Sequence, residues 1–387
     1  MEKLYMDNAA GTPMHPQVIE AIIPFLKEGF GNPSNIHQFG RFTGDAIRSA
    51  RESVANLINA KANEIIFTSS GTEANNFAIK GLSAANKKKG NHIITSQTEH
   101  FSVLNPLKSL EKSGYEVTCL PVDKYGLVNP DDVKNAIKPA TILVSILFAN
   151  GEIGTIEPIR EISAVVKAKD ILFHTDAVAA AGNIPIDVAD AAVDVLSMSA
   201  NQFYGPSGAG ALYVREGVRL LPFIEGGVQE GGRRAGTENV IGIVGMGKAA
   251  ELAKSEMPQR VKHIQKLRDM LCEGLLKKIS NIHVNGHPAN RLPGHLSVCI
   301  EFIEGESVLL FLDMQGIAIS SGSACTSRSL KASHVIMATG VDPALAQGTV
   351  LFSIGRENTE EDVECVLEKL PPIVERLRQM SPLYHQK

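Results

Sequence analysis

The sequence of 387 residues contains no tryptophan, only five cysteines and no marked surplus of either charge. Its 38 basic and 42 acidic side chains give a net charge of −4, which argues against a nucleic-acid-binding protein and against an acidic disordered chain. The cysteines form no CxxC pair, so we expect neither a zinc ribbon nor a disulfide framework but reduced thiols in a cytoplasmic protein. Cys119 and Cys299 fall in apolar runs and are predicted core residues, and Cys272 and Cys365 are predicted packing residues on helices.

Long hydrophobic runs are also missing. The longest uncharged stretch, 195–214, contains Pro206 and three glycines, so we expect no membrane span there. The first residues, MEKLYMDNAAGT, do not show a basic segment followed by an apolar one, and we expect no secretion signal. What the sequence does contain is 34 glycines without any internal repeat, which is typical of the many tight loops of an α/β enzyme.

Short apolar runs rich in β-branched residues alternate with amphipathic stretches in the middle of the chain. They predict seven strands, at 65–70, 92–97, 116–122, 141–148, 171–177, 195–200 and 210–214. The helices predicted between them include 72–88, 102–113, 130–138 and 158–169. Apolar strands separated by helices indicate an α/β fold whose sheet is mainly parallel and covered on both faces.

The pattern changes near residue 257. A long charged helix, 257–279, leads into a mixed region that predicts a smaller α+β domain. Its predicted strands lie near 281–285, 295–303 and 349–354, its helices at 306–314 and 359–379, and a loop at 318–332. We therefore expect a large domain over 15–256 and a small domain formed by 1–14 and 257–387.

Polar residues follow the predicted parallel strands at the points where these strands end. They are Ser70-Gly71-Thr72, Thr98-Glu99-His100, Asn150-Gly151-Glu152, Asp176 and the segment Ser199 to Gln202. Because ligands of open α/β sheets bind beyond the carboxyl ends of the strands, these groups predict a site on one edge of the sheet. Gly71 and Thr72 stand at the start of a predicted helix, where backbone N–H groups can bind an anion or a phosphate.

Two glycine-rich segments only superficially match nucleotide-binding motifs. Residues 242–249 fit GxxxxGK but end in Ala249, so the hydroxyl that would hold magnesium is missing. The surrounding VIGIVGMGKAAELA is better explained as one helix with small residues on a packing face. Residues 205–210 form a glycine-rich turn before a strand, and we expect no dinucleotide site there.

Two single residues leave alternatives open. Cys325 lies among small and hydroxylic residues with Arg328 and Lys331 nearby, which suits either an exposed, partly ionised thiol or an incidental loop cysteine. Arg356 follows a predicted strand and suits either a surface ion pair or a clamp on a substrate carboxylate.

The glycine-rich loop 226–237 leaves a similar choice. It carries Arg233, Arg234 and Thr237, which suit a phosphate contact or an oligomer contact.

A resemblance to a known family rests on segments that span almost the whole chain. They are DNAAGTP (7–13), GNPSNIH (31–37), FTSSGTEANNFAIKG (67–81), TEH (98–100), NGEIG (150–154), HTDA (174–177), YGPSGAGALYV (204–214), GGRRAGTEN (231–239), SSGSACTS (320–327) and FSIGR (352–356). Together they resemble a cysteine desulfurase of the NifS/IscS type, in the class V aminotransferase group. The longer cysteine loop resembles the subgroup that serves iron–sulfur cluster assembly.

The resemblance implies a homodimer with the pyridoxal-phosphate (PLP) fold of type I and assigns roles to matching residues. The implied cofactor-binding residues are Gly71, Thr72, His100, Asn150, Asp176, Ser199 and, from the other subunit, Thr237. Asp176 would pair with the pyridine nitrogen and His100, a catalytic residue as well, would stack on the ring. Arg356 would bind the substrate carboxylate. Cys325 would take sulfur from L-cysteine as a persulfide, leaving alanine.

The sequence departs from the family pattern at the cofactor. Gln202 stands where the family has the lysine that forms the Schiff base with PLP, and Asn201 stands where it has a histidine. An amide is not a nucleophilic amine, so PLP is expected to bind non-covalently at most. Ala179 also replaces a glutamine, and Asn35 replaces a serine in the GNPSNIH segment.

Two functions from different classes follow. The first is sulfur supply from L-cysteine, through a Cys325 persulfide, to an IscU-like iron–sulfur scaffold protein, without nucleic-acid or membrane partners. The alternative is a non-catalytic scaffold partner that accepts sulfide or ligates a cluster such as [2Fe-2S] through Cys325, shared with the scaffold protein. A selenocysteine lyase or another class V enzyme is a third interpretation, which the intact cysteine loop disfavours.

Overall fold

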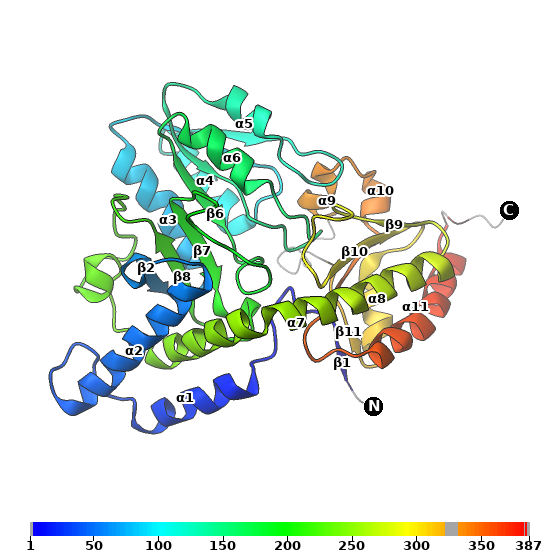
Figure 1. The fold of residues 1–387 in the computed structure, drawn as a ribbon. Coiled ribbons are helices and arrows are strands. Elements are labelled where there is room, and N and C mark those ends of the chain that lie inside the picture. The colour runs from blue at the N-terminus through cyan, green and yellow to red at the C-terminus, as the bar shows by residue number, and fades with distance from the viewer. Residues whose placement is uncertain (1–2, 322–331, 383, 385–387) are drawn as a thin grey trace.

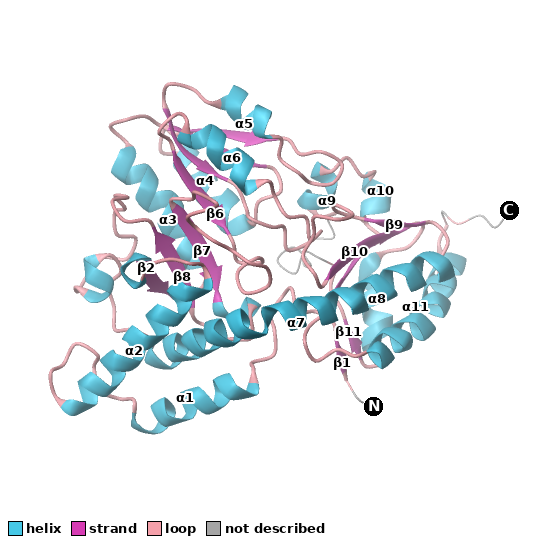
Figure 2. Cartoon of the chain, in the orientation of Figure 1, coloured by secondary structure: helices cyan, strands magenta, loops and turns pink. Residues whose placement is uncertain are grey.

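The computed structural model describes residues 3–321, 332–382 and 384 and shows a large sheet and a smaller unit joined by one long helix (Figures 1 and 2). The large sheet has seven strands in the order β2-β8-β7-β6-β5-β3-β4. β8 is antiparallel to both of its neighbours and the other pairs are parallel, so the predicted mainly parallel sheet is confirmed. The bounds are β2 (Ile65–Thr68), β3 (His92–Ser96), β4 (Glu116–Leu120), β5 (Thr141–Ser145), β6 (Leu172–Asp176), β7 (Val195–Ser199) and β8 (Gly210–Val214).

Four helices lie within two residues of the predicted bounds. They are α3 (Gly71–Asn86), α4 (Phe101–Glu111), α5 (Pro130–Ala136) and α6 (Ile159–Lys167). The strongest local signals are at their starts: Ser70 caps α3, and Asn129 caps α5 immediately before Pro130.

Two further helices, α1 (Pro16–Glu28) and α2 (Gln38–Leu57), were not among the predicted ones. Both begin at a histidine, because the ring Nδ1 of His15 and of His37 accepts a backbone N–H of the first turn. Histidine is not among the preferred N-cap residues, so its sequence signal for a helix start is weak.

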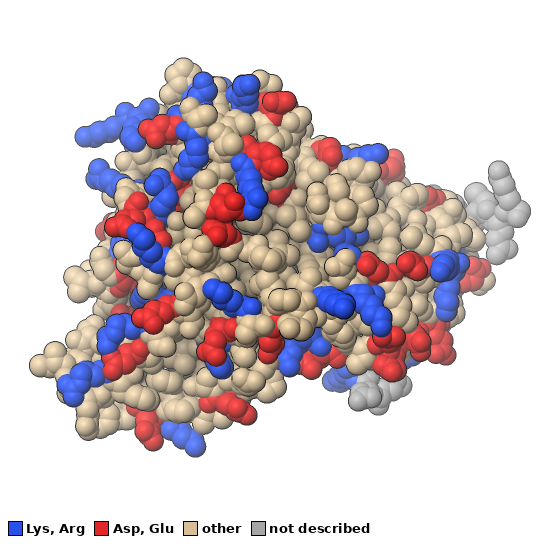
Figure 3. All heavy atoms as spheres, viewed as in Figure 1, with Lys and Arg blue, Asp and Glu red and all other residues tan. Residues whose placement is uncertain are grey.

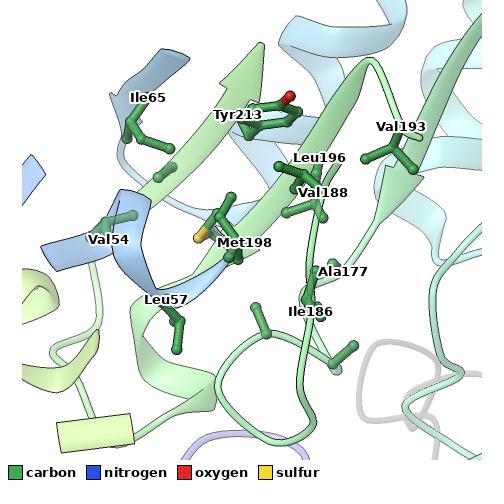
Figure 4. Packing of buried hydrophobic residues seen from close by; sticks show 14 of the residues in the cluster. Val54, Leu57, Ile65, Ala177, Ile186, Val188, Val193, Leu196, Met198 and Tyr213 are labelled. Atoms are coloured by element: carbon green, nitrogen blue, oxygen red, sulfur yellow. The ribbon is translucent and has the colours of Figure 1, made fainter. Parts of the chain in front are cut away.

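The larger hydrophobic core lies between the central strands and the helices packed on them. Val54 and Leu57 of α2 belong to one buried cluster with Leu196 and Met198 of β7 and with Tyr213 of β8 (Figure 4). All five residues of β7 are buried. A strand covered on both faces must be apolar throughout, which explains why these strands appear in the sequence as continuous apolar runs.

The smaller unit contains two small sheets and its own core. β9 (Ile282–Val284), β10 (His295–Ile300) and β12 (Thr349–Ser353) form an antiparallel sheet in the order β12-β10-β9, and β1 (Leu4–Tyr5) pairs parallel with β11 (Ile317–Ala318). The helices are α8 (Gly305–Asp313), α9 (His334–Ala338), α10 (Pro343–Ala346) and α11 (Glu360–Met380). Short 3₁₀ turns elsewhere are η1 (Ala62–Glu64), η2 (Ala200–Gln202) and η3 (Gln229–Gly232).

Helix α7 (Val240–Lys278) runs without interruption along the large sheet and into the smaller unit (Figure 1). The prediction that a helix starts at 257 was wrong, because the two helical segments are one and Pro258 lies inside it. An interior proline costs about 3 kcal/mol in a helix. Packing on both sides offsets this cost, since Met257 belongs to the larger core and Ile264 to the smaller one. The domain boundary at 256/257 stays a prediction.

The cysteines test the predicted packing. Cys299 of β10 is buried, as predicted, and Cys272 and Cys365 pack partly buried against the smaller core. The prediction for Cys119 was wrong, because this thiol is exposed on β4. β4 is the edge strand of the large sheet, so its residues lack a second neighbouring strand.

Charged side chains of both signs are interspersed on the face shown in Figure 3, as the nearly balanced composition predicts. Within the described ranges, no helix combines the length and the apolar composition needed to cross a bilayer.

Gly247 allows α7 to approach α2 closely. A Cβ at this position would lie 2.5 Å from the Cα of Ala50, which is too short for two non-bonded carbons. We expect Gly247→Ala to destabilise the protein by about 1–3 kcal/mol, because the two helix backbones must separate. Helix propensity alone would make this substitution stabilising, because alanine is the better helix former. A loss of stability would therefore report the close approach of the two helices. Urea unfolding followed by circular dichroism measures the change.

The control on the same helix is Gly274→Ala. The nearest atoms to a Cβ there belong to the Leu367 side chain, with Cδ1 2.4 Å away, rather than to a helix backbone. We expect a smaller loss of stability or a gain. Equal destabilisation by the two substitutions would contradict the role assigned to the approach of α7 and α2.

Candidate active site

A cavity of about 430 Å³ lies at the carboxyl edge of the large sheet. Residues at or just beyond the carboxyl ends of β2, β3, β5, β6 and β7 line it: Ser70, Gly71, Thr72, Thr98, Glu99, His100, Asn150, Gly151, Glu152, Asp176, Ser199, Asn201 and Gln202. The predicted convergence of these strand ends on one edge is therefore confirmed. The smaller unit contributes to the wall through Ser320, His334 and Leu351.

The turn between β2 and α3 presents the start of a helix to the cavity. Ser70 caps α3, and its Oγ accepts the N–H of Glu73 at 3.1 Å. Gly71 follows, and a Cβ there would lie 2.4 Å from Val178 Cγ2 and 3.4 Å from Ser199 Cβ. A side chain is thus excluded at Gly71, and the backbone at the positive end of the α3 dipole lies open to an anion.

Asp176 ends β6 with its carboxylate held in place. Its Oδ1 accepts the N–H of Val178 at 2.9 Å, and its Oδ2 accepts from Asn75 Nδ2 at 2.6 Å. Burial raises the pKa of Asp176, because a charged carboxylate loses its hydration there, and the two hydrogen bonds oppose this effect. The arrangement provides a fixed hydrogen-bond acceptor on the cavity floor.

His100 stands at the start of α4 as its N-cap. Its Nδ1 accepts the backbone N–H of Ser102 at 3.1 Å and lies 2.7 Å from Ser102 Oγ. The next residue, Phe101, stacks at a tilt on His334, with ring centroids 4.6 Å apart. His334 Nε2 in turn bonds to the carbonyl of Glu99 at 2.9 Å. Aromatic groups from both parts of the chain therefore form one wall of the cavity.

Asn150 shapes the turn after β5. Its Oδ1 accepts the N–H groups of Glu152 and Ile153 at 2.8 and 3.0 Å, and its Nδ2 donates to the carbonyl of Thr98 at 3.0 Å. These bonds leave one amide hydrogen of Asn150 for a ligand.

Side chains of the segment after β7 form hydrogen bonds within the protein. Ser199 Oγ donates to Asn201 Oδ1 at 2.7 Å, and Gln202 Nε2 donates to the carbonyl of Ala9 at 2.9 Å. The carbonyl of Gln202 accepts from Asn183 Nδ2 at 3.1 Å. Gln202 thus lines the cavity while its amide nitrogen binds the N-terminal segment.

Three predicted site residues are not among those lining the cavity. Thr237 is exposed on the loop before α7. Arg356 donates its backbone N–H to Tyr204 Oη at 2.9 Å and pairs through Nε with Glu357 at 3.0 Å. Its buried Nη1 has no partner among the described residues. Cys325 lies outside the described residues.

The arginines of the glycine-rich loop serve contacts within the chain. Arg234 forms an ion pair with Glu73 at 2.9 Å, and Arg233 donates to the carbonyls of Glu230 and Asn63, each at 3.2 Å. Neither of the predicted uses, a phosphate or an oligomer contact, is needed to explain them.

Sequence reasoning missed two functional candidates on the cavity floor and wall, Asn75 and Ser102. Asn75 follows Gly71 by four residues, so the helical period places both on the same face of α3. That spacing was a usable signal. Ser102 gave none, because serine in the first turn of a helix is common.

The sequence also did not indicate that Glu99 and Glu152, two acidic residues at strand ends, have raised pKa values. Glu99 is fully buried, and its pKa is raised well above the usual value by loss of hydration. Burial raises the pKa of Glu152 to about 7, although Ser333 Oγ donates to its carboxylate. Only the tertiary structure reveals that Glu99 is fully buried and Glu152 half-buried.

Glu152 should make stability depend on pH. A folded-state pKa of about 7, above the usual value of 4.5, means that stability falls as pH rises from 4.5 to 7. We expect Glu152→Gln to be more stable than the parent at pH 8, by up to about 3 kcal/mol, and to gain nothing at pH 5. Thermal unfolding at both pH values measures the difference.

The control is Glu216→Gln at an exposed position. A hydrogen bond from Lys61 lowers the pKa of Glu216, so its loss should bring no gain at pH 8. The same stabilisation in both variants, or none in Glu152→Gln, would contradict the expected burial effect.

The sequence and the fold were compared with those of known proteins. The class V aminotransferase family matches residues 4–366. The cysteine desulfurase IscS of Methanosarcina thermophila is 54% identical over 380 residues, which cover 98% of this chain and 94% of that protein. The cysteine desulfurase IscS of Dictyoglomus turgidum is 53% identical over 380 residues, covering 98% and 96%.

Solved structures give the same assignment. A NifS-like protein superposes with a TM-score of 0.92 at 38% identity, covering 97% of this chain and 100% of that one. A NifS-like protein from Rickettsia africae superposes with a TM-score of 0.87 at 30% identity, with the same coverage. By sequence, by fold and by the groups gathered at the carboxyl edge of its sheet, this chain belongs to the cysteine desulfurases of the NifS/IscS type within the class V aminotransferase family.

Proposed function

We propose that this protein mobilises sulfur from L-cysteine for iron–sulfur cluster assembly in the cytoplasm, with Cys325 as the residue that receives the sulfur. The observation that carries the proposal is the cavity, where a helix start, the carboxylate of Asp176 and the imidazole of His100 face the same space. Relatives 54% and 53% identical bear the name cysteine desulfurase IscS. The role of Cys325 rests on the SSGSACTS segment around it.

The residues present fit PLP, which is the cofactor expected for this family. Asn75 Oδ1 is buried in the cavity wall without a partner among the described residues, and a polar ligand would satisfy it. Gly71, Thr72 and Ser199 would hold the phosphate, and Thr237 would reach it from a second subunit.

The ring would be held by the remaining groups. Asp176 would bind the pyridine nitrogen, His100 would stack on the ring, and Asn150 would contact its hydroxyl group. When bound, PLP supplies an electron sink for bonds at the substrate α-carbon.

The substrate would be held by the chain's own residues. The buried Nη1 of Arg356 without a partner in the described structure suits a substrate carboxylate, because a guanidinium binds a carboxylate through two parallel bonds. The Cys325 thiolate would attack the sulfur of L-cysteine and form the S–S bond of a persulfide. The bond between this sulfur and the substrate β-carbon would break, and its electron pair would stay on the carbon, which takes up a proton to give alanine. A polar, basic neighbourhood in the sequence favours the thiolate form of Cys325.

Covalent attachment of PLP is excluded from the proposal. Gln202 occupies the position that the resemblance assigns to the Schiff-base lysine, and its amide nitrogen binds the Ala9 carbonyl. Ala179 removes one further family contact. We therefore propose non-covalent PLP at most and slow turnover, since loss of a positioned base costs about 10²–10⁴-fold in rate.

The same substitution favours a second function. With the cofactor lysine absent, the protein would act as a non-catalytic partner whose Cys325 thiolate ligates a [2Fe-2S] cluster shared with an IscU-like scaffold protein. Thiolate sulfur is the usual ligand of iron in such clusters. The cluster is then the cargo that the two proteins hold together.

A homodimer is the proposed assembly. Large apolar side chains are exposed on α1, on α2 and on the loop between them: Ile19, Ile23, Leu26, Phe30, Ile36, Phe39 and Phe42. Phe30 is 75% and Ile36 is 90% exposed, which is unusual for a surface that stays in water. The family resemblance implies that Thr237 of the second copy would reach the cofactor.

Replacing Gln202 by lysine would supply the amine that the family resemblance places at this position. We expect the double variant Gln202→Lys with Asn201→His to bind PLP covalently and to produce more alanine from cysteine than the parent, because the other cofactor groups are in place. Absorbance after incubation with PLP, followed by borohydride reduction and peptide mass mapping, measures the attachment.

Gln202→Met is the matched control, because methionine has a similar length but no amine. It should form no reduced adduct. A pyridoxyl adduct on an active-site peptide of the parent, or no gain in the double variant, would contradict this account of the pocket.

The sulfur-carrying role is tested at the thiol. We expect Cys325→Ser to abolish both persulfide formation from cysteine and cluster retention with the scaffold protein, while dimerisation and scaffold binding persist. Persulfide labelling and iron content of the purified complex are the measurements.

The control is Cys119→Ser, which removes an exposed thiol on the edge strand β4. This variant should behave like the parent. Parental persulfide and iron levels in Cys325→Ser would place the functional sulfur chemistry at other residues.

A further inference from the structure

A chain of hydrogen bonds connects the two groups proposed to hold the pyridine ring. Asn75 Nδ2 lies 2.6 Å from Asp176 Oδ2 and 2.8 Å from Ser102 Oγ. Ser102 Oγ lies 2.7 Å from His100 Nδ1. All four residues line the cavity, and Asn75 and Ser102 are buried, at 1% and 6% exposure. The two bonds of Asn75 are therefore shielded from competing water, whereas His100 at the end of the hydrogen-bond chain is exposed.

The direction of these bonds follows from one backbone donor. The Ser102 N–H, which can only donate, points at His100 Nδ1 at 3.1 Å, so this nitrogen is the acceptor. Ser102 Oγ must then donate its own hydrogen to Nδ1, and its lone pair accepts from the Asn75 amide. The second amide hydrogen of Asn75 is left for Asp176.

We infer that Asn75 and Ser102 are positioning residues that hold the neutral His100 imidazole in the tautomer protonated at Nε2. Two donors meet at Nδ1, so the proton of the neutral ring is on Nε2. Nε2 makes no hydrogen bond to any other described residue and is the nitrogen available to a ligand. Asp176 fixes the opposite end of the chain, because its carboxylate accepts the amide.

This tautomer limits what His100 can do. A neutral imidazole protonated at Nε2 presents a hydrogen-bond donor and no lone pair at that atom, so it binds an acceptor group of a ligand and cannot remove a proton from it. A neutral histidine used as an electrophile is an established catalytic device. The consequence for catalysis rests on the proposed function, whereas the tautomer itself does not.

The tautomer is measurable without cofactor or substrate. In protein labelled with ¹⁵N-histidine, long-range ¹H–¹⁵N correlation at alkaline pH separates protonated from unprotonated ring nitrogens. We expect an unprotonated Nδ1 and a protonated Nε2 for His100, whose signals are identified by their loss in His100→Gln.

Two substitutions interrupt the series of hydrogen bonds between Asp176 and His100, and two leave it intact. Ser102→Ala and Asn75→Leu should each move the two nitrogen shifts of His100 toward one another, as a mixture of tautomers forms. Ser102→Thr keeps the hydroxyl and should restore the parental pattern. Asn86→Ala is the matched control, because Asn86 is another asparagine of α3 and its amide donates to the carbonyl of Leu82 at 2.9 Å, apart from the four residues of the hydrogen-bond chain.

The inference is overturned if the parent shows a protonated Nδ1 or averaged nitrogens, or if Ser102→Ala and Asn75→Leu both keep the parental pattern. The parental spectrum decides the tautomer even if one variant fails to fold. Failure of the proposed function is separate, since absence of Cys325-dependent alanine and cluster retention would leave this tautomer unchanged.

Discussion

A parallel sheet buried on both faces controls where this protein can place polar groups. Strands β5, β6 and β7 are almost completely enclosed, and a polar side chain in their interior costs free energy unless it finds a hydrogen-bond partner. Their carboxyl ends are different, because backbone N–H groups of the following turns are available there. Asp176 accepts from Val178, and Glu99 accepts from Leu147, in each case through such a backbone donor. The cavity is therefore located where the fold can compensate buried charge.

The second constraint is that the cavity needs both parts of the chain. Helix α7 crosses from one core to the other without a break, and the smaller unit places Ser320 and His334 in the cavity wall. The ring of His334 packs on Phe101, next to His100. Among the described residues, none of α7 lines this cavity. A change in the packing of α7 would nevertheless alter the cavity wall, because α7 packs on both parts of the chain that form it.

The segment after β7 places two amide side chains, Asn201 and Gln202, in the cavity wall. The Gln202 amide binds the N-terminal segment at Ala9, and the Asn201 side chain binds Ser199. The Gln202 amide nitrogen and the Asn201 amide oxygen are thus bonded within the protein, and Asn201 Nδ2 has no hydrogen-bond partner among the described residues. Two other residues of the cavity wall are held in the same way, since Asp176 accepts from Asn75 and Asn150 donates to the carbonyl of Thr98.

The sequence by itself determined the α/β class, the strands and most helices, the polar groups at the strand ends and the family, because apolar runs and short motifs are local features. It did not determine that α7 continues through Pro258, that Cys119 is exposed on an edge strand, or that His15 and His37 start helices. Packing against both cores outweighs the local preference at Pro258, and the place of β4 at the edge of the sheet exposes Cys119. The histidine caps are local bonds whose sequence signal is weak. The Asp176–Asn75–Ser102–His100 chain was decided only by the tertiary structure, since residues from α3, α4 and β6 meet there. Hydrogen-bond direction depends on the approach of atoms to within about 3 Å, and only the packing of the helices on the sheet sets that approach.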